Sequence, residues 1–166
     1  MAAMEAFSEK APNHEGAAAQ RATGKETPPQ PLYDLIEALF FAYRDFVGDA
    51  DRLLIGYGFG RAHHRVLHFV HRQPGLSITE LLEILKITKQ SLNRVLKNLV
   101  EQNFIEVRAG AIDRRQRHLY ATAAGHDFAT RLAEVQTARF ERALAQLGPQ
   151  SQSEAKRFLD AMRDRM

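Results

Sequence analysis

The chain has 166 residues, of which 45% are hydrophobic and 26% are charged, and it contains no cysteine. This composition is typical of a globular protein, and the lack of cysteine excludes disulfides, thiolate metal sites and thiol-based catalysis or redox sensing. No apolar stretch approaches the roughly 20 residues that a membrane span needs, and the N-terminus lacks the apolar core of a signal peptide. We therefore expect a soluble cytoplasmic protein that does not bind membranes.

Positive charge is concentrated in the middle third of the chain. The net charge of the whole protein is +3, but residues 61–120 alone hold eleven Lys and Arg against five Asp and Glu, and residues 1–60 are net acidic. A basic segment of this kind suits a polyanionic partner, although a merely solvated basic surface would have the same composition. Charge alone does not decide between the two.

The first sixty residues divide into a tail and a helix. Residues 1–30 are rich in Ala, Glu, Gly and Pro, so they cannot bury enough apolar area to fold, and we predict a flexible tail. Apolar side chains then recur at spacings of three and four, which predicts a helix of about four turns over residues 32–47 that ends at Gly48. We assign residues 31–60 to this N-terminal helix and its loop. The apolar stripe consists of Leu32, Leu35, Ile36, Leu39, Phe40, Tyr43 and Phe46.

Residues 61–121 show the order of elements that a winged helix-turn-helix domain requires. The predicted elements are helices over 61–72, 77–85 and 89–102 and strands over 104–108 and 116–121. Ser77 and Glu80 have the spacing of a capping box, and Thr88 stands where the third helix begins. The inner face of that third helix consists of Leu92, Val95, Leu96, Leu99 and Val100.

The C-terminal part, residues 122–166, is predicted to form two further helices. A long apolar repeat predicts a helix from 122 to about 147, and Ser151 with Glu154 has the spacing of a capping box for the last helix. Together with residues 32–47, these helices present more apolar surface than a central domain of about 60 residues can cover. We therefore expect a homodimer in which the terminal helices form the interface.

The outer face of the helix over 89–102 has the composition of a DNA-reading surface. Gln and Asn side chains can pair with adenine and Arg with guanine, while Lys and Thr contact phosphates. A solvated helix would mix acidic residues with Lys at such spacings, yet none occurs before Glu101. We predict that this helix reads the major groove through Thr88, Lys89, Gln90, Asn93, Arg94 and Lys97, with Asn98 on the same face.

The predicted hairpin that follows is also basic. Its charged residues include Arg108, Arg114, Arg115, Arg117 and His118, with Asp113 as the only acid after Glu106. Arginines on a two-stranded ribbon can reach a flanking minor groove or the phosphates, whereas an edge hairpin can carry charge simply to stay soluble. Beside a DNA-reading helix we favour the first interpretation, with Arg114, Arg115 and Arg117 as the contacts.

The stretch from about Phe59 to Gly125 resembles the multiple-antibiotic-resistance regulator (MarR) family. The resemblance is carried by residues 73–81, by residues 96–105 and, most specifically, by Asp113-Arg114-Arg115 followed nine residues later by Thr122-Ala123-Ala124-Gly125. Two departures occur: the wing tip is Ala109-Gly110-Ala111-Ile112, where the family often has Pro and Asp, and Ala121 replaces a larger aliphatic residue.

This resemblance implies a fold that is mainly α with a small β-hairpin wing, a winged helix-turn-helix with N- and C-terminal dimerisation helices. It also implies a homodimer that binds a palindrome-like double-stranded DNA operator, usually as a repressor. Arg115 would lie near the minor groove.

Four histidines on the helix over 61–72 form a separate candidate site. His64, His68 and His71 share one face, which would suit a transition metal, haem iron or a pH-sensitive cluster. No cysteine or carboxylate in the helix completes such a site, so we favour solvated or interface histidines and predict no metal and no cofactor. If a small effector binds, we expect it where the first two helices meet the long helix, with Tyr43, Phe46 and this histidine face as its lining.

No phosphate-binding loop, nucleophile elbow or paired catalytic motif occurs in the chain, so we predict that it is not an enzyme. The favoured function is a sequence-specific transcription regulator that a small ligand tunes. Two alternatives stay open. One is a helical dimer that acts through protein partners and binds nucleic acid nonspecifically, and the other is a metal- or haem-responsive sensor that uses the face of His64, His68 and His71.

Overall fold

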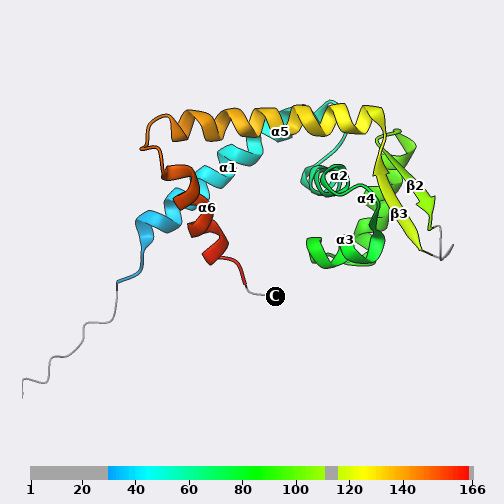
Figure 1. Cartoon of the computed structure of the whole chain (residues 1–166), viewed down its shortest axis with the longest axis horizontal. Helices are drawn as coiled ribbons and strands as arrows, with labels where there is room; N and C mark the ends of the chain where they lie inside the picture. The colour runs from blue at the N-terminus through cyan, green and yellow to red at the C-terminus, as the bar shows by residue number, and fades with distance from the viewer. Residues whose placement is uncertain (1–29, 111–115, 165–166) are drawn as a thin grey trace, which may run out of the picture. The chain divides into compact units, whose positions relative to one another are not determined.

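The computed structural model describes residues 30–110 and 116–164 of the chain (Figure 1). Its elements are α1 (Tyr33–Ile55), α2 (Arg61–Arg72), β1 (Leu76–Ser77), α3 (Ile78–Leu85), α4 (Lys89–Glu101), β2 (Ile105–Ala109), β3 (Arg117–Ala121), α5 (Ala123–Leu144) and α6 (Ser151–Ala161). The predicted fold class, mainly helical with a small β wing, is confirmed. The predicted tail, apart from Gln30, lies outside the described residues. Within them, no helix is long and apolar enough to cross a membrane.

The core surrounds α2, which contacts α1, α3, α4, α5 and β3. Val66, Leu67 and Val70 form the buried face of α2 and are at most 1% exposed. Truncating a buried side chain of this kind to Ala costs about 2–5 kcal/mol, so these positions carry much of the stability. The buried residues that join them include Leu81, Leu85, Leu92, Leu96, Leu99, Phe104, Leu119, Phe128 and Leu132.

The wing belongs to a three-stranded antiparallel sheet with the order β1-β3-β2. In this sheet Val107 of β2 lies opposite Leu119 of β3, and Leu119 also lies opposite Leu76 of β1. The sequence predicted the two long strands but not β1, because two residues are too few to show alternation. The hairpin tip, residues 111–115, lies outside the described residues.

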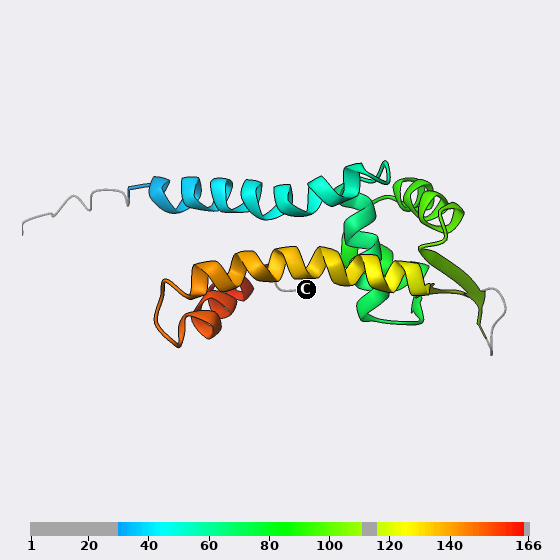
Figure 2. The ribbon, with the colours of Figure 1, turned by 90° about the horizontal axis from the view of Figure 1, so that it is seen from above.

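Helix α1 is longer than the sequence predicted. The expectation that Gly48 ends the helix is wrong, because α1 continues to Ile55 as one helix (Figure 2) and contacts α5. Val47, Ala50 and Leu54 are buried there. Their burial outweighs the roughly 1 kcal/mol that glycine costs inside a helix.

Three smaller expectations about the helices are also wrong. Val100 is 41% exposed and does not belong to the inner face of α4. The long helix α5 ends at Leu144 rather than near 147. Ser151 does not cap α6, because it is the first helical residue and its hydroxyl donates to the carbonyl of Gly148.

A close backbone contact joins the end of α4 to the start of α5. The Thr122 amide donates to the Phe104 carbonyl at 3.1 Å, and the Thr122 hydroxyl donates to the Asn103 carbonyl at 2.6 Å and accepts from the Gly125 amide at 3.0 Å. A Cβ at Gly125 would lie 1.9 Å from the Phe104 carbonyl oxygen. Only glycine fits at this position.

His63 holds the start of α2 in place and lies beside Asn98 of α4. The Gly60 amide donates to His63 Nδ1 at 3.1 Å, and the imidazole stacks on Phe59 with ring centroids 4.8 Å apart. His63 Nε2 lies 3.5 Å from the side-chain nitrogen of Asn98. Because Nδ1 accepts a hydrogen bond, this geometry requires an unprotonated Nδ1 and therefore a neutral ring.

We expect Gly125→Ala to lower the free energy of unfolding by about 2–3 kcal/mol, because the new methyl group must displace backbone rather than a flexible side chain. Gly48→Ala is the matched control: a Cβ there has no atom within 4 Å, so the helix should gain up to about 1 kcal/mol. Urea unfolding at one protein concentration measures both. Equal stability of Gly125→Ala and the parent would contradict the close contact.

The stability of the protein should fall as the pH drops below about 6.5. Burial lowers the pKa values of His63, His64, His68 and His71 below the ordinary value. The unfolded chain then takes up protons at a pH where the folded protein does not, and the loss stops beneath the folded-state pKa values.

This pH dependence can be measured by urea unfolding in steps from pH 7.5 to 5. His63→Asn keeps an acceptor for the Gly60 amide but removes one titrating ring, so its stability should vary less with pH than that of the parent. An unchanged slope would show that His63 does not contribute.

Candidate nucleic-acid interface

The N-terminal caps predicted for α3 and for α4 are both present. The Ser77 side chain accepts from the Glu80 amide, and the Ser77 amide donates to the Glu80 carboxylate at 2.8 Å, so the capping box is confirmed. At the other end of α3, Lys86 has φ 52°, a left-handed conformation that stops the helix. The Thr88 hydroxyl then accepts from the Ser91 amide at 3.2 Å and opens α4.

Burial of one face of α4 leaves the predicted DNA-contacting face in solvent. Thr88 and the α4 side chains Lys89, Gln90, Asn93, Arg94 and Lys97 are all exposed. Among the described residues, no side-chain hydrogen bond involves Gln90, Asn93 or Arg94, and Lys97 forms only a surface ion pair with Glu101, 3.7 Å between charged atoms. The side chains of Gln90, Asn93 and Arg94 are therefore available to a ligand, whereas the Thr88 hydroxyl already bonds Ser91.

Asn98 does not belong to this exposed face. It is half-buried and turns toward His63 of α2, so its inclusion in the outer face of α4 was wrong. The reason is helical geometry: Asn98 lies about 100° further round the helix than Lys97 and faces α2.

A hollow separates the start of α4 from the wing. Its volume is about 720 Å³, and its lining brings Lys89 of α4 and Arg117 of β3 to the same space. The remaining lining residues are Ser77, Ile78, Thr79, Glu80, Leu82, Gln116 and His118. Lys89, Arg117 and two hydroxyls thus share a concave surface with the Glu80 carboxylate, to which Ser77 donates, between the two predicted DNA-binding elements. The wing arginines Arg114 and Arg115 lie outside the described residues.

Two other basic residues of the wing have roles inside the sheet. Arg108 lies over the Tyr120 ring, 4.3 Å from its centroid, and pairs with Glu106. His118 Nδ1 lies 2.7 Å from the Gly75 carbonyl and donates to it, which ties β3 to the turn after α2. These contacts brace the strand that carries Arg117.

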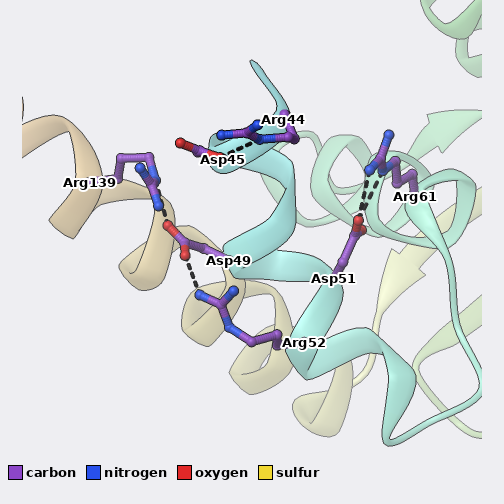
Figure 3. A network of polar contacts seen from close by, with 7 residues as sticks. All are labelled: Arg44, Asp45, Asp49, Asp51, Arg52, Arg61 and Arg139. Carbon is purple, nitrogen blue, oxygen red and sulfur yellow. Dashed lines mark hydrogen bonds and ion pairs between the residues drawn. The ribbon is translucent and has the colours of Figure 1, made fainter. Parts of the chain in front are cut away.

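Ion pairs hold α1 to both of its neighbours (Figure 3). Asp49 of α1 pairs with Arg139 of α5 and with Arg52, and only 11% of its side chain is exposed. The hydrogen bond from Arg139 lowers the pKa of Asp49, and the bond from Arg52 acts in the same direction. One half-turn further, Asp51 pairs with Arg61 of α2 at 3.0 Å. These ion pairs therefore hold the C-terminal part of α1 against α5 and α2.

A cavity of about 290 Å³ lies where α1, α2 and α5 meet. It brings together four of the five residues that we proposed for an effector site, Tyr43, Phe46, His64 and His68. Its other lining residues are Val47, Arg61, Arg65, Phe69 and Gln136. The two arginines share the helical spacing of His64 and His68 and could have been found from the sequence, whereas Gln136 comes from a distant helix.

His71 is not among the residues that line this cavity. Its ring lies against that of His126 on α5, with centroids 4.6 Å apart, and its Nδ1 is buried without a hydrogen-bond partner. The three-histidine face therefore divides between two places. Across residues 30–110 and 116–164, no three His, Asp or Glu side chains are grouped so that they could hold a metal ion.

Comparison with known sequences agrees with this geometry. The sequence profile of the MarR family matches residues 57–116. The chain is 46% identical over 129 residues to the HTH-type transcriptional regulator PetP of Rhodobacter capsulatus, and the match covers 78% of each chain. It is 32% identical over 96 residues to the HTH-type transcriptional repressor Rv2887 of Mycobacterium tuberculosis, covering 58% of this chain and 69% of the repressor.

Solved structures show the same fold at low sequence identity. A crystal structure of MarR superposes with a TM-score of 0.59 at 22% identity, over 80% of this chain and 95% of MarR. The S. aureus MepR–DNA complex superposes with a TM-score of 0.62 at 18% identity, over 81% of this chain and 97% of MepR. Together, the fold, the exposed face of α4 and the match to PetP establish that the chain belongs to the MarR family of winged helix-turn-helix transcription regulators, which are not enzymes.

Proposed function

We propose that this regulator is a homodimeric repressor that binds a palindrome-like DNA operator and is released from it by a small ligand. The observation that carries the proposal is the exposed face of α4, which has no acidic residue before Glu101 and whose first residue, Lys89, lines a hollow shared with Arg117. The related Rv2887 protein is described as a repressor.

In this proposal α4 enters the major groove. Gln90, Asn93 and Arg94 are exposed side chains in the N-terminal half of that helix, so they contact base edges. Thr88, Lys89 and Lys97 surround them and contact phosphates, which sets the position of the helix but not its sequence preference. The wing contacts the flanking minor groove or phosphates through Arg117 and, by the family resemblance, through Arg114 and Arg115.

Dimerisation explains the apolar surface that a single chain leaves exposed. In the N-terminal half of α1, the Phe40 side chain is 65% exposed and Leu39 is 42% exposed. Phe158 of α6 is likewise 54% exposed, and so is Met162 directly after that helix. Soluble monomers rarely expose so many large apolar side chains on neighbouring turns, and a two-fold dimer would present two copies of α4 to a palindrome.

The cavity at the junction of α1, α2 and α5 is the proposed effector site. Its volume of about 290 Å³ is at the small end of the range for ligand pockets. Rings from Tyr43 and Phe46 provide apolar contacts, and His64 and His68 provide hydrogen-bonding groups. A ligand here would act on DNA binding only through its differential affinity for the DNA-binding and the released dimer, and operator DNA would weaken ligand binding by the same factor.

Sequence specificity separates this function from a dimer that binds nucleic acid nonspecifically. A duplex recovered by selection from a random-sequence library should bind at least about 10³-fold more tightly than its scrambled version at the same salt concentration. Equal affinities for the two duplexes would reject the proposed function.

We expect Arg94→Ala and Gln90→Ala to lose discrimination at one or two base pairs, with a cost of about 1–3 kcal/mol each, because a bidentate contact is removed. Arg115→Ala should weaken binding to all duplexes with little change in base preference. Arg131→Ala, an exposed arginine of α5, is the control for lost charge. Parent-like binding and base preference of Arg94→Ala would show that α4 is not the reading helix.

The purified protein should sediment as a dimer at micromolar concentration. Phe40→Asp should shift it toward monomer without damaging the protomer core, because Phe40 is exposed in the single chain. Glu37→Ala, on an exposed position of the same helix, should leave the dimer intact. A folded parent monomer at micromolar concentration would rule out the proposed interface.

A further inference from the structure

Arg65 of α2 belongs to two sites at once. Its side chain lines the cavity between α1, α2 and α5. Its guanidinium also donates a hydrogen bond to the carbonyl oxygen of Leu85, 3.3 Å away, although the two residues are 20 positions apart in the sequence. Arg65 thus connects the proposed effector cavity with α3.

The Leu85 carbonyl lies at the C-terminal end of α3, next to the turn that leads into α4. Leu85 is the last residue of α3, where helix carbonyls have no partner within the helix and carry partial negative charge. Lys86 then adopts the left-handed conformation, and Thr88 caps α4 only three residues after Leu85. A cation held at this carbonyl therefore stabilises the turn that sets the orientation of α4 relative to α3.

The charges around the cavity leave Arg65 as the group that can respond to an anion. The other arginine of the lining, Arg61, is neutralised by Asp51 at 3.0 Å. Within the part of the chain that the structure describes, no carboxylate lies within ion-pair distance of Arg65. Burial, and then repulsion from His68, lowers the pKa of His64. Burial also lowers the pKa of His68, so both imidazoles favour the neutral form.

We propose that Arg65 is a positioning residue that couples the cavity to the DNA-reading helix. A small organic anion in the cavity competes with the Leu85 carbonyl for the Arg65 guanidinium, because a carboxylate is a stronger acceptor than a backbone carbonyl. The released turn then allows α4 to leave its DNA-reading orientation. This inference rests on the proposed regulation of DNA binding by a ligand at this cavity.

The positioning role is tested without any ligand. Arg65→Gln should bind the selected duplex about five- to tenfold more weakly than the parent, and the amides of residues 86–89 should exchange with deuterium faster. Arg65→Lys keeps the charge and a donor and should restore most of the affinity. Arg72→Gln removes an exposed arginine from the same helix and should behave like the parent. Parent-like affinity and exchange of Arg65→Gln would overturn the positioning role.

The coupling is tested with benzoate as the anionic probe and benzamide as its neutral counterpart. Benzoate, but not benzamide, should weaken duplex binding by the parent and speed exchange at residues 86–89, and it should change neither quantity in Arg65→Gln. An equal effect of benzoate on both proteins would overturn the coupling, although the cavity would remain an effector site.

Two further outcomes distinguish the anion competition, the positioning role and the proposed function from one another. No effect of benzoate on the parent would overturn the anion competition, whereas the ligand-free comparison would still decide the positioning role. If no duplex is bound specifically, the proposed function fails, and deuterium exchange in Arg65→Gln still reports whether Arg65 holds the turn.

Discussion

Val66, Leu67 and Val70 of α2 are almost completely buried, and α1, α3, α4, α5 and β3 all contact this helix. A helix can turn only part of its surface toward a core, so the burial of this face sends His64, Arg65 and His68 to the opposite side. There they meet α1 and α5 and line a cavity. Burial of one face of α2 therefore places polar groups where α1, α2 and α5 meet. It also orients Arg65 toward α3.

Helix α1 has two halves with different surroundings. Its C-terminal half is buried through Ala50 and Leu54 and is held by Asp49 and Asp51, which pair with different helices. Its N-terminal half leaves Phe40 exposed within the single chain. One continuous helix thus extends from the protomer core to the apolar surface that we assign to a partner, so the position of that partner bears directly on the core.

Local signals in the sequence predicted what local interactions determine. Ser77 and Thr88 cap α3 and α4 as expected, because a cap depends on residues three positions away. Gly48 failed as a helix end because tertiary burial of its neighbours outweighs its low helix propensity. The pairing of His71 with His126 and the approach of Gln136 to the cavity depend on how α5 packs against α1 and α2, which no local pattern encodes.

The contact between Gly125 and the Phe104 carbonyl holds the first turn of α5 against the segment that follows α4. No side chain separates the first turn of α5 from the Phe104 carbonyl, just after α4, and the Thr122 amide donates to that same carbonyl. Helix α5 spans 22 residues, which corresponds to a length of about 33 Å. A tilt of about 5° at one end then displaces the other by about 3 Å, which exceeds the tolerance of a direct hydrogen bond to a base. If α4 reads DNA as we propose, a small angular adjustment at the far end of α5 is therefore sufficient to disengage it.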